Sequence, residues 1–417
     1  MTTAVHPAQK RILGVLVTAQ ILSGAGLAAG ITVGALLAQD MLGGAGLAGL
    51  PSTLFTIGSA AAAIIVGRVS DRLGRRAGLA SGYAAGAAGG VGVVIAATIG
   101  NVPLLFLSFF VYGAGTATNL QARYAGADLA SPRHRGRAVS TVLVATTVGA
   151  VAGPNLVTVT GDLAHTMGVP RLAGPFLLAI LAYSAAAVVL WIMLRPDPLT
   201  TARALAGGAA TETTPVAEAA GDTGSRTQLM LGAGVMVLTQ LIMVAIMTMT
   251  PIHMQHHGHG VGAAGLVIAV HVAGMYLPSP LSGLLVDRFG RPAVAAASGV
   301  TLLAAGLLAA LAPPHSVWLL ALALALLGLG WNFGLVSGTA IITDTVPLAT
   351  RAKTQGAVDV AIALAGAGGG MASGLVVAAS GYPALAIMGG VLALAVIPAV
   401  AFTTRPGTAP AVSRRSG

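Results

Sequence analysis

A nine-residue pattern, GxxxDRxGR, occurs twice in the chain and constrains the fold more than any other feature. The first copy occupies residues 67–75 and the second occupies residues 283–291, 216 residues later. Each copy lies in a short polar segment between two long apolar stretches. Asp128 and Asp344 keep the same offset, and each ends an apolar stretch and precedes a basic loop. Two hydrophobic halves with polar segments at equivalent positions predict a duplicated helical membrane bundle.

The composition also indicates a membrane protein. Hydrophobic residues make up 56% of the 417 residues, charged residues make up 8%, and the mean hydropathy is +0.88. A soluble domain has roughly 25% charged residues, and a membrane-spanning helix needs about 20 apolar residues. We therefore predict an all-α membrane protein with twelve transmembrane helices in two pseudo-symmetric six-helix bundles. The expected spans are 12–38, 45–66, 79–99, 103–128, 138–160, 174–194, 227–251, 261–285, 293–312, 316–342, 355–379 and 383–404.

The basic residues predict the orientation in the membrane. The net charge is +10, and every Lys and Arg except Arg123 and Arg171 falls in a terminus or in loops on one side of the predicted spans. This asymmetry follows the positive-inside rule and places both termini in the cytoplasm of a bacterial inner membrane. It also excludes nucleic acid as the partner that the charge would otherwise suggest. The first span is too long for a signal-peptide core, so we expect it to be an uncleaved helix. The chain has no cysteine, so disulfides and thiolate ligands are excluded.

Changes in composition predict the domain boundaries. We expect an N-terminal six-helix bundle over 1–195, a cytoplasmic linker over 196–226, a C-terminal six-helix bundle over 227–404 and a cytoplasmic tail over 405–417. The linker is rich in Pro, Gly, Ala and Thr and has no apolar periodicity, although a short amphipathic helix fits around residues 200–206.

The GxxxDRxGR segment between the second and third helices of each half resembles the signature loop of the major facilitator superfamily. The resemblance implies a transporter that works by alternating access between two bundles. Arg75 can bridge to Asp128, and Asp71 can accept hydrogen bonds from a helix N-terminus, where the dipole favours an anion. The 216-residue offset predicts an equivalent cluster in the second half, formed by Asp287, Arg291 and Asp344.

In the superfamily, such charge clusters latch the cytoplasmic side in the outward-open state, so the resemblance implies gating roles for both clusters. The alternative is that these basic loops only fix the topology.

Methionine and histidine suggest one kind of cargo. Met243 and Met247 share a face of the seventh predicted span, and His271 and Met275 share a face of the eighth. Met243 and His271 are equally far from the loop between these helices, so we expect them at the same depth near mid-membrane. Thioether and imidazole groups bind copper. The predicted arrangement is a ladder of weak metal sites, although methionine is also an ordinary packing residue.

The loop between the seventh and eighth spans contains a short histidine-rich tract, and such tracts are metal-binding candidates. It can equally be a solvated turn or a pH-responsive gate. The MxxxM and HxxxM patterns on these two helices resemble those of the CcoA-like copper importers, and the resemblance implies copper import. The four histidines of the loop are His253, His256, His257 and His259.

Three polar residues within the predicted spans are further site candidates, because such groups in a membrane usually face a cavity. Arg123 can snorkel to the interface or face an anionic cargo. Asp359 can carry a proton or pair with an arginine of the first signature loop, and Asn332 can line the cavity. Phe109 occupies the place of the arginine in the superfamily's fourth-helix motif, which leaves coupling through that group in doubt.

The alternative cargo is a small organic molecule moved with protons, by drug efflux or by riboflavin-like uptake. A receptor or scaffold without transport is a further alternative. We find no phosphate loop and no nucleophile constellation, so the sequence predicts neither an enzyme nor a bound cofactor. The expected partners are membrane lipid, a small solute or copper ion, and protons.

Overall fold

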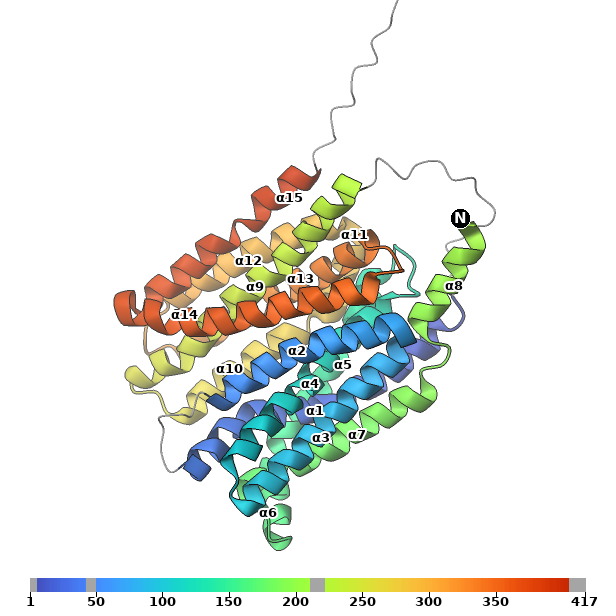
Figure 1. Ribbon diagram of the computed structural model, residues 1–417. Coiled ribbons are helices and arrows are strands. Elements are labelled where there is room, and N and C mark those ends of the chain that lie inside the picture. The colour runs from blue at the N-terminus through green and yellow to red at the C-terminus, as the bar shows by residue number, and fades with distance from the viewer. Residues whose placement is uncertain (1–5, 43–49, 211–221, 405–417) are drawn as a thin grey trace, which may run out of the picture.

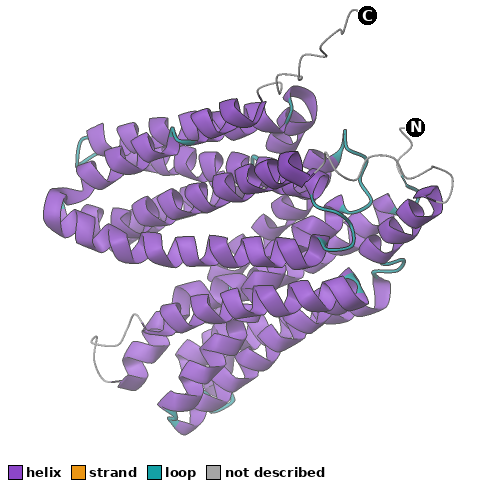
Figure 2. Ribbon diagram, turned by 45° about the horizontal axis from the view of Figure 1, so that its top comes forward, coloured by secondary structure: helices purple, strands orange, loops and turns teal. Residues whose placement is uncertain are grey.

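The computed structural model describes residues 6–42, 50–210 and 222–404, and the described part consists of helices joined by short loops (Figures 1 and 2). The predicted C-terminal tail and the middle of the predicted linker lie outside the described residues. The helices before the linker are α1 (Gln9–Leu42), α2 (Leu50–Leu73), α3 (Arg75–Ile99), α4 (Val102–Ala127), α5 (Arg135–Asn155), α6 (Val157–Thr166), the short 3-10 helix η2 (Arg171–Ala173) and α7 (Gly174–Met193). A separate helix, α8 (Pro198–Ala210), lies within the linker.

The second half repeats this arrangement. Its helices are α9 (Asp222–His256), α10 (Val261–Tyr276), α11 (Ser279–Phe289), α12 (Arg291–Leu311), α13 (Val317–Thr345), α14 (Arg351–Ala393) and α15 (Val396–Thr404). Two groups of helices, α1–α7 and α9–α15, lie side by side (Figure 1). Each group has its own large apolar core, as expected for two bundles.

Among the described residues, ten stretches are long and apolar enough to cross a membrane. One of them, Arg351–Thr403, contains two passes, because the chain reverses direction at Gly381, where φ is +81°. A further pass is formed by α5, which begins near the start of the predicted 138–160 span. The predicted twelve spans are therefore present. The predicted 261–285 span is divided into α10 and α11, because Pro280 at the start of α11 lacks a backbone N–H donor.

The two GxxxDRxGR segments lie at the same end of the molecule, which we call the motif end and which the basic residues predict to be cytoplasmic. Gly74 and Gly290 in these segments each have a φ of +91° and precede α3 and α12. Glycine adopts this conformation without the steric cost that a side chain would bring. The second glycine of the pattern therefore allows the tight connection between consecutive helices in both halves.

Candidate functional site: a central cavity closed at the motif end

A cavity of about 310 Å³ lies between the two halves. Helices α2 and α4 of the first half and α9, α10, α13 and α14 of the second contribute to its wall. Its aromatic lining consists of Phe55, Tyr276 and Trp331, and its polar lining consists of Thr56, Ser59, Thr116, Asn119, Gln240 and Asp359. Because the lining combines aromatic faces with hydrogen-bonding groups, the cavity suits an amphipathic organic molecule.

An ion pair between the halves lies at the edge of the cavity nearer the motif end. The guanidinium Nη2 of Arg123 in α4 is 2.7 Å from Oδ1 of Asp359 in α14, and both side chains are almost completely buried. The Tyr124 hydroxyl donates a second hydrogen bond to the same carboxylate oxygen, at 3.1 Å. The other oxygen, Oδ2, has no hydrogen-bond partner among the described residues. The carboxylate of Asp359 is thus held at one oxygen and free at the other.

Arg123 also lies where the two halves meet around their pseudo-symmetry axis. Its Nε donates to the hydroxyl of Thr339 in α13 at 3.0 Å, and Thr339 is 216 residues further along the chain. Equivalent positions of the two halves therefore contact each other directly. Of the two alternatives that the sequence left open for Arg123, snorkelling and inward-facing, the structure has the inward-facing one.

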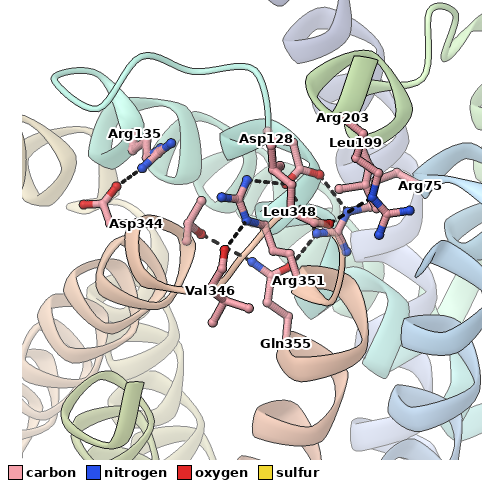
Figure 3. A network of polar contacts seen from close by, with 12 residues as sticks. Arg75, Asp128, Arg135, Leu199, Arg203, Asp344, Val346, Leu348, Arg351 and Gln355 are labelled. Carbon is pink, nitrogen blue, oxygen red and sulfur yellow. Dashed lines mark hydrogen bonds and ion pairs between the residues drawn. The ribbon is translucent and has the colours of Figure 1, made fainter. Parts of the chain in front are cut away.

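A buried charge cluster joins the halves at the motif end (Figure 3). Nε of Arg75 lies 2.8 Å from Oδ2 of Asp128, and Nη1 of Arg351 from the other half lies 3.8 Å from Oδ1. Nη2 of Arg75 also donates to Oε1 of Gln355 in α14. One carboxylate is therefore shared by an arginine from each half.

A second cluster with the same design joins Asp344 to two arginines. Arg291 lies 2.8 Å from Asp344, and Arg135 of the other half also pairs with it. Both arginines and Asp344 stand 216 residues from their counterparts in the first cluster, but these side chains are partly exposed. Burial, together with repulsion from Arg351 and Arg291, lowers the pKa of Arg135 to about 10, so this side chain stays charged at neutral pH.

The aspartates within the two GxxxDRxGR segments have different partners. Asp287 accepts hydrogen bonds from the backbone N–H groups of Gly136 and Arg137 at the start of α5, at 2.9 and 3.1 Å. The sequence predicted a helix N-terminus as the partner of Asp71, and it is the equivalent residue, Asp287, that has this contact. Asp71 instead forms an ion pair with Arg203 of α8, at 2.6 Å.

Close helix contacts accompany the charge clusters. A methyl group added at Gly67 would lie 3.0 Å from the carbonyl oxygen of Ala352 and 3.1 Å from Cα of Gly356. Gly283 makes the equivalent contact with Gly136 and Ser140, where an added methyl group would lie 2.5 Å from the carbonyl oxygen of Gly136. The first glycine of each pattern therefore lets a helix of one half pack tightly on a helix of the other. Among the described residues, the polar contacts between the halves lie at the motif end or beside the cavity, so the motif end is closed.

The methionines and the histidine of the predicted ladder do not share one surface. Met243 and Met275 line the cavity, whereas His271 is buried and its Nδ1 lies 2.8 Å from the carbonyl oxygen of Leu324 in α13. Met247 is half-buried and packs against the core of the C-terminal half. The position of His271 therefore differs from the one that a ladder along the cavity requires. The physical reason is that α10 packs mainly against α13 and only slightly against α9.

The histidines at the end of α9 interact mostly with backbone and with one tyrosine. The His253 ring stacks on Tyr382 with ring centroids 4.4 Å apart, and it lies 4.4 Å from the His257 ring. Nε2 of His259 lies 2.7 Å from the carbonyl oxygen of Pro314, and His256 is exposed. Within the part of the chain that the structure describes, no group of three or more His, Cys, Asp or Glu side chains is arranged to hold a metal ion.

Asn332 does not line the cavity. Its side-chain amide donates to the carbonyl oxygen of Met275 and to the hydroxyl of Ser279, both at 2.7 Å, and so supports the break between α10 and α11. Trp331 was not among the predicted site residues, but its Nε1 donates to Gln240 at 2.6 Å beside the cavity. Arg135 and Arg351 were not predicted either, although the 216-residue offset between them is a signal in the sequence.

A central cavity between two pseudo-symmetric bundles, closed at one end by paired charge clusters, defines a secondary transporter. The family model described as "Major Facilitator Superfamily" matches residues 16–262 and 230–417. The chain belongs to the major facilitator superfamily, and it is a multi-pass membrane transporter rather than an enzyme.

Comparison with known proteins gives further relatives. The chain is 59% identical to the Bacillus subtilis "Uncharacterized MFS-type transporter YdeG" over 404 residues, which cover 94% of this chain and 92% of the relative. It is 30% identical to the "Riboflavin transporter RfnT" of Brucella anthropi over 362 residues, which cover 84% of this chain and 85% of the relative.

Among solved structures, the human organic anion transporter MFSD10 matches with a TM-score of 0.76 at 16% identity, covering 95% of this chain and all of that chain. A double-tryptophan variant of XylE matches with a TM-score of 0.77 at 16% identity, covering 95% of this chain and 96% of that one. Both confirm the fold.

Proposed function

We propose that the protein is a proton-coupled transporter of a small, flat organic solute in a bacterial inner membrane, with both termini in the cytoplasm. The observation that carries the proposal is the carboxylate of Asp359, which has one oxygen in an ion pair and the other without a partner at the cavity wall. An ionisable group inside a membrane is costly unless it has a function. A buried carboxylate that lies at the cavity wall and is paired to the opposite half suits a proton carrier.

Protonation of Asp359 would act on the contact between the halves. A neutral carboxyl attracts the guanidinium of Arg123 less than a carboxylate does, so proton binding weakens the link between α4 and α14. The bundles 1–195 and 227–404 would then move relative to each other, and the cavity would open at the motif end. Release of the proton on that side restores the ion pair and the closed state.

The two charge clusters would serve as the latch that holds the motif end closed. The proposal assigns Asp128, Arg75 and Arg351 to one part of the latch, and their counterparts in the second cluster to the other. Asp71 and Asp287 join the latch through their contacts with Arg203 and with the start of α5. Support comes from Arg351 and Arg135, each of which pairs with the aspartate of the opposite half.

The lining of the cavity supports a flat heteroaromatic cargo of the riboflavin type. The Tyr276 and Trp331 rings meet edge to face with centroids 5.8 Å apart, and Trp331 is fixed by its hydrogen bond to Gln240. Rigid aromatic faces favour stacking with a flat ring system. Asn119 and Gln240 add amide groups that can bind ring nitrogens and carbonyl oxygens. The similarity to the riboflavin transporter RfnT points to the same class of solute.

Copper is the second candidate, because the thioethers of Met243 and Met275 both line the cavity. The buried position of His271 against α13 leaves these two thioethers without the imidazole that the ladder requires. We therefore rank copper below an organic solute. Drug efflux would use the same cavity and the same proton carrier, with the organic solute moving out of the cell.

Growth of a riboflavin auxotroph that lacks its own uptake system separates these cargoes. We expect expression of this protein to restore growth on low riboflavin and to leave cellular copper content unchanged. A rise in copper content without riboflavin uptake would favour the copper reading. Increased resistance to heteroaromatic drugs without uptake of either would indicate efflux.

A further inference from the structure

The linker helix α8 is fixed to the N-terminal half at two points. One carboxylate oxygen of Asp197 accepts hydrogen bonds from the N–H groups of Leu199 and Thr200, at 3.0 and 3.1 Å, and so caps α8. The other oxygen accepts from the N–H of Arg76 at the start of α3, at 2.7 Å. Leu199 is fully buried, and Ala202 belongs to the apolar core of the N-terminal half. α8 is thus a docked element of that half.

One side chain of this helix reaches the other half. The guanidinium of Arg203 donates to the carbonyl oxygen of Leu348, in the loop before α14, at 2.9 Å (Figure 3). It also donates to the carbonyl oxygen of Ala349, the next residue of this loop, at 2.9 Å. The same guanidinium pairs with the carboxylate of Asp71 at 2.6 Å and also donates to the Asp71 carbonyl oxygen, at 2.6 Å. Four hydrogen bonds therefore join the signature loop of the first half to a loop of the second through one planar cation.

The two equivalent aspartates of the internal repeat reach the opposite half in different ways. In the second half, the equivalent aspartate, Asp287, binds the start of α5 directly. In the first half, the guanidinium of Arg203 stands between Asp71 and the segment that leads into α14. Arginine suits this place because its planar group presents several donors in a fixed geometry, which lysine lacks.

We propose that Arg203 is a positioning residue of the transport cycle, acting as a removable clasp that holds the motif end closed by linking Asp71 to residues 348–349. Opening of the motif end separates these two loops, so all bonds of Arg203 to the second half break in that step. The linker thereby stabilises the closed state and sets how often the motif end opens. This inference concerns gating and holds whatever the cargo is.

The test measures access to the cavity from the motif end and needs no substrate. The chain has no cysteine, so Ala363→Cys at the cavity wall provides one reactive site for a membrane-impermeant maleimide in vesicles of known orientation. In this background, Arg203→Gln should raise the labelling rate from the motif end roughly tenfold, since hydrogen bonds to a charged group are removed. Arg203→Lys should give an intermediate rate.

Arg68→Gln is the matched control, because Arg68 is an exposed arginine at the same end and its loss should not change the labelling rate. Asp71→Asn combined with Arg203→Gln should give little more labelling than Arg203→Gln alone. If Arg203→Gln does not fold, Arg203→Lys and Asp71→Asn carry the test. Labelling rates of the Arg203 variants equal to that of Arg68→Gln, or full additivity with Asp71→Asn, would overturn the clasp.

Discussion

Arg123 in α4 and Asp359 in α14 form a 2.7 Å ion pair that crosses from one half of the protein to the other beside the central cavity. The pair is buried, and each partner depends on the other because an isolated charge in such a site is very costly. Around it, the Tyr124 hydroxyl and the Thr339 hydroxyl complete the contacts between the halves. A cargo entering the cavity therefore meets a charge pair whose strength depends on protonation.

The two charge clusters should differ in their effect on gating. Asp128 and Arg75 are fully buried, whereas Asp344 and its two arginines are partly exposed to solvent. Solvent screens an exposed ion pair, while removing one partner of a buried pair costs about 3–5 kcal/mol. Asp128→Asn should therefore increase labelling of a cavity cysteine from the motif end far more than Asp344→Asn does. Equal effects of the two substitutions would contradict the proposed division of the latch.

The close approach of α2 to α14 should be needed only for the closed state. Gly67→Leu places a side chain where the carbonyl oxygen of Ala352 and Cα of Gly356 now lie, so the motif end should remain open and net transport should stop. Gly14→Leu is the control, because an added methyl group there meets nothing within 4 Å. Spin-label distances across the motif end check the prediction, and an unchanged distance distribution in Gly67→Leu would refute it.

The buried histidine should serve stability and not cargo binding. His271→Leu removes the hydrogen bond to the carbonyl oxygen of Leu324 and should lower the melting temperature of the purified protein. Transport per folded molecule should remain within about twofold, because His271 is not among the residues that line the cavity. Met243→Leu keeps the volume at the cavity wall nearly constant and should also transport normally. If both variants fold but lose transport, Met243 and His271 both act in transport, as the copper ladder predicts.

Trp331 should set the affinity for a flat cargo. Trp331→Leu removes one aromatic face from the cavity, a loss of about 1 kcal/mol of stacking energy, and should raise the KM for riboflavin roughly fivefold with a small change in kcat. Trp318→Leu is the matched control, because the Trp318 side chain is 75% exposed on the outer surface. An unchanged KM in the Trp331 variant would exclude stacking on this ring.

The repeated signature was sufficient to predict the fold, because sequence periodicity and charge placement in a membrane protein leave few alternatives. Residues 200–206 suggested the linker helix, but nothing in the sequence placed Arg203 against Asp71. The position of Arg203 could not be predicted because α8 docks on the N-terminal half through Asp197. This tertiary contact has no signal in the sequence.

The copper prediction lacks support for a related reason. Spacing fixes which residues share a helix face, as it did for Met243 and Met247, but it does not fix which neighbour that face meets. His271 bonds to Leu324 of α13 and is not at the cavity wall, although Met275, one turn further along α10, is. The inward position of Asp359 followed from the cost of charge in a membrane, whereas its pairing with Arg123 required the packing of two helices 236 residues apart in the chain.

Riboflavin uptake into proteoliposomes under an imposed pH gradient tests the central claim most directly. The account predicts that the native protein accumulates riboflavin only when the gradient is present. It also predicts that Asp359→Asn abolishes this accumulation but retains exchange of labelled for unlabelled riboflavin at equal concentrations. Gradient-driven accumulation by Asp359→Asn at the native rate would contradict the account.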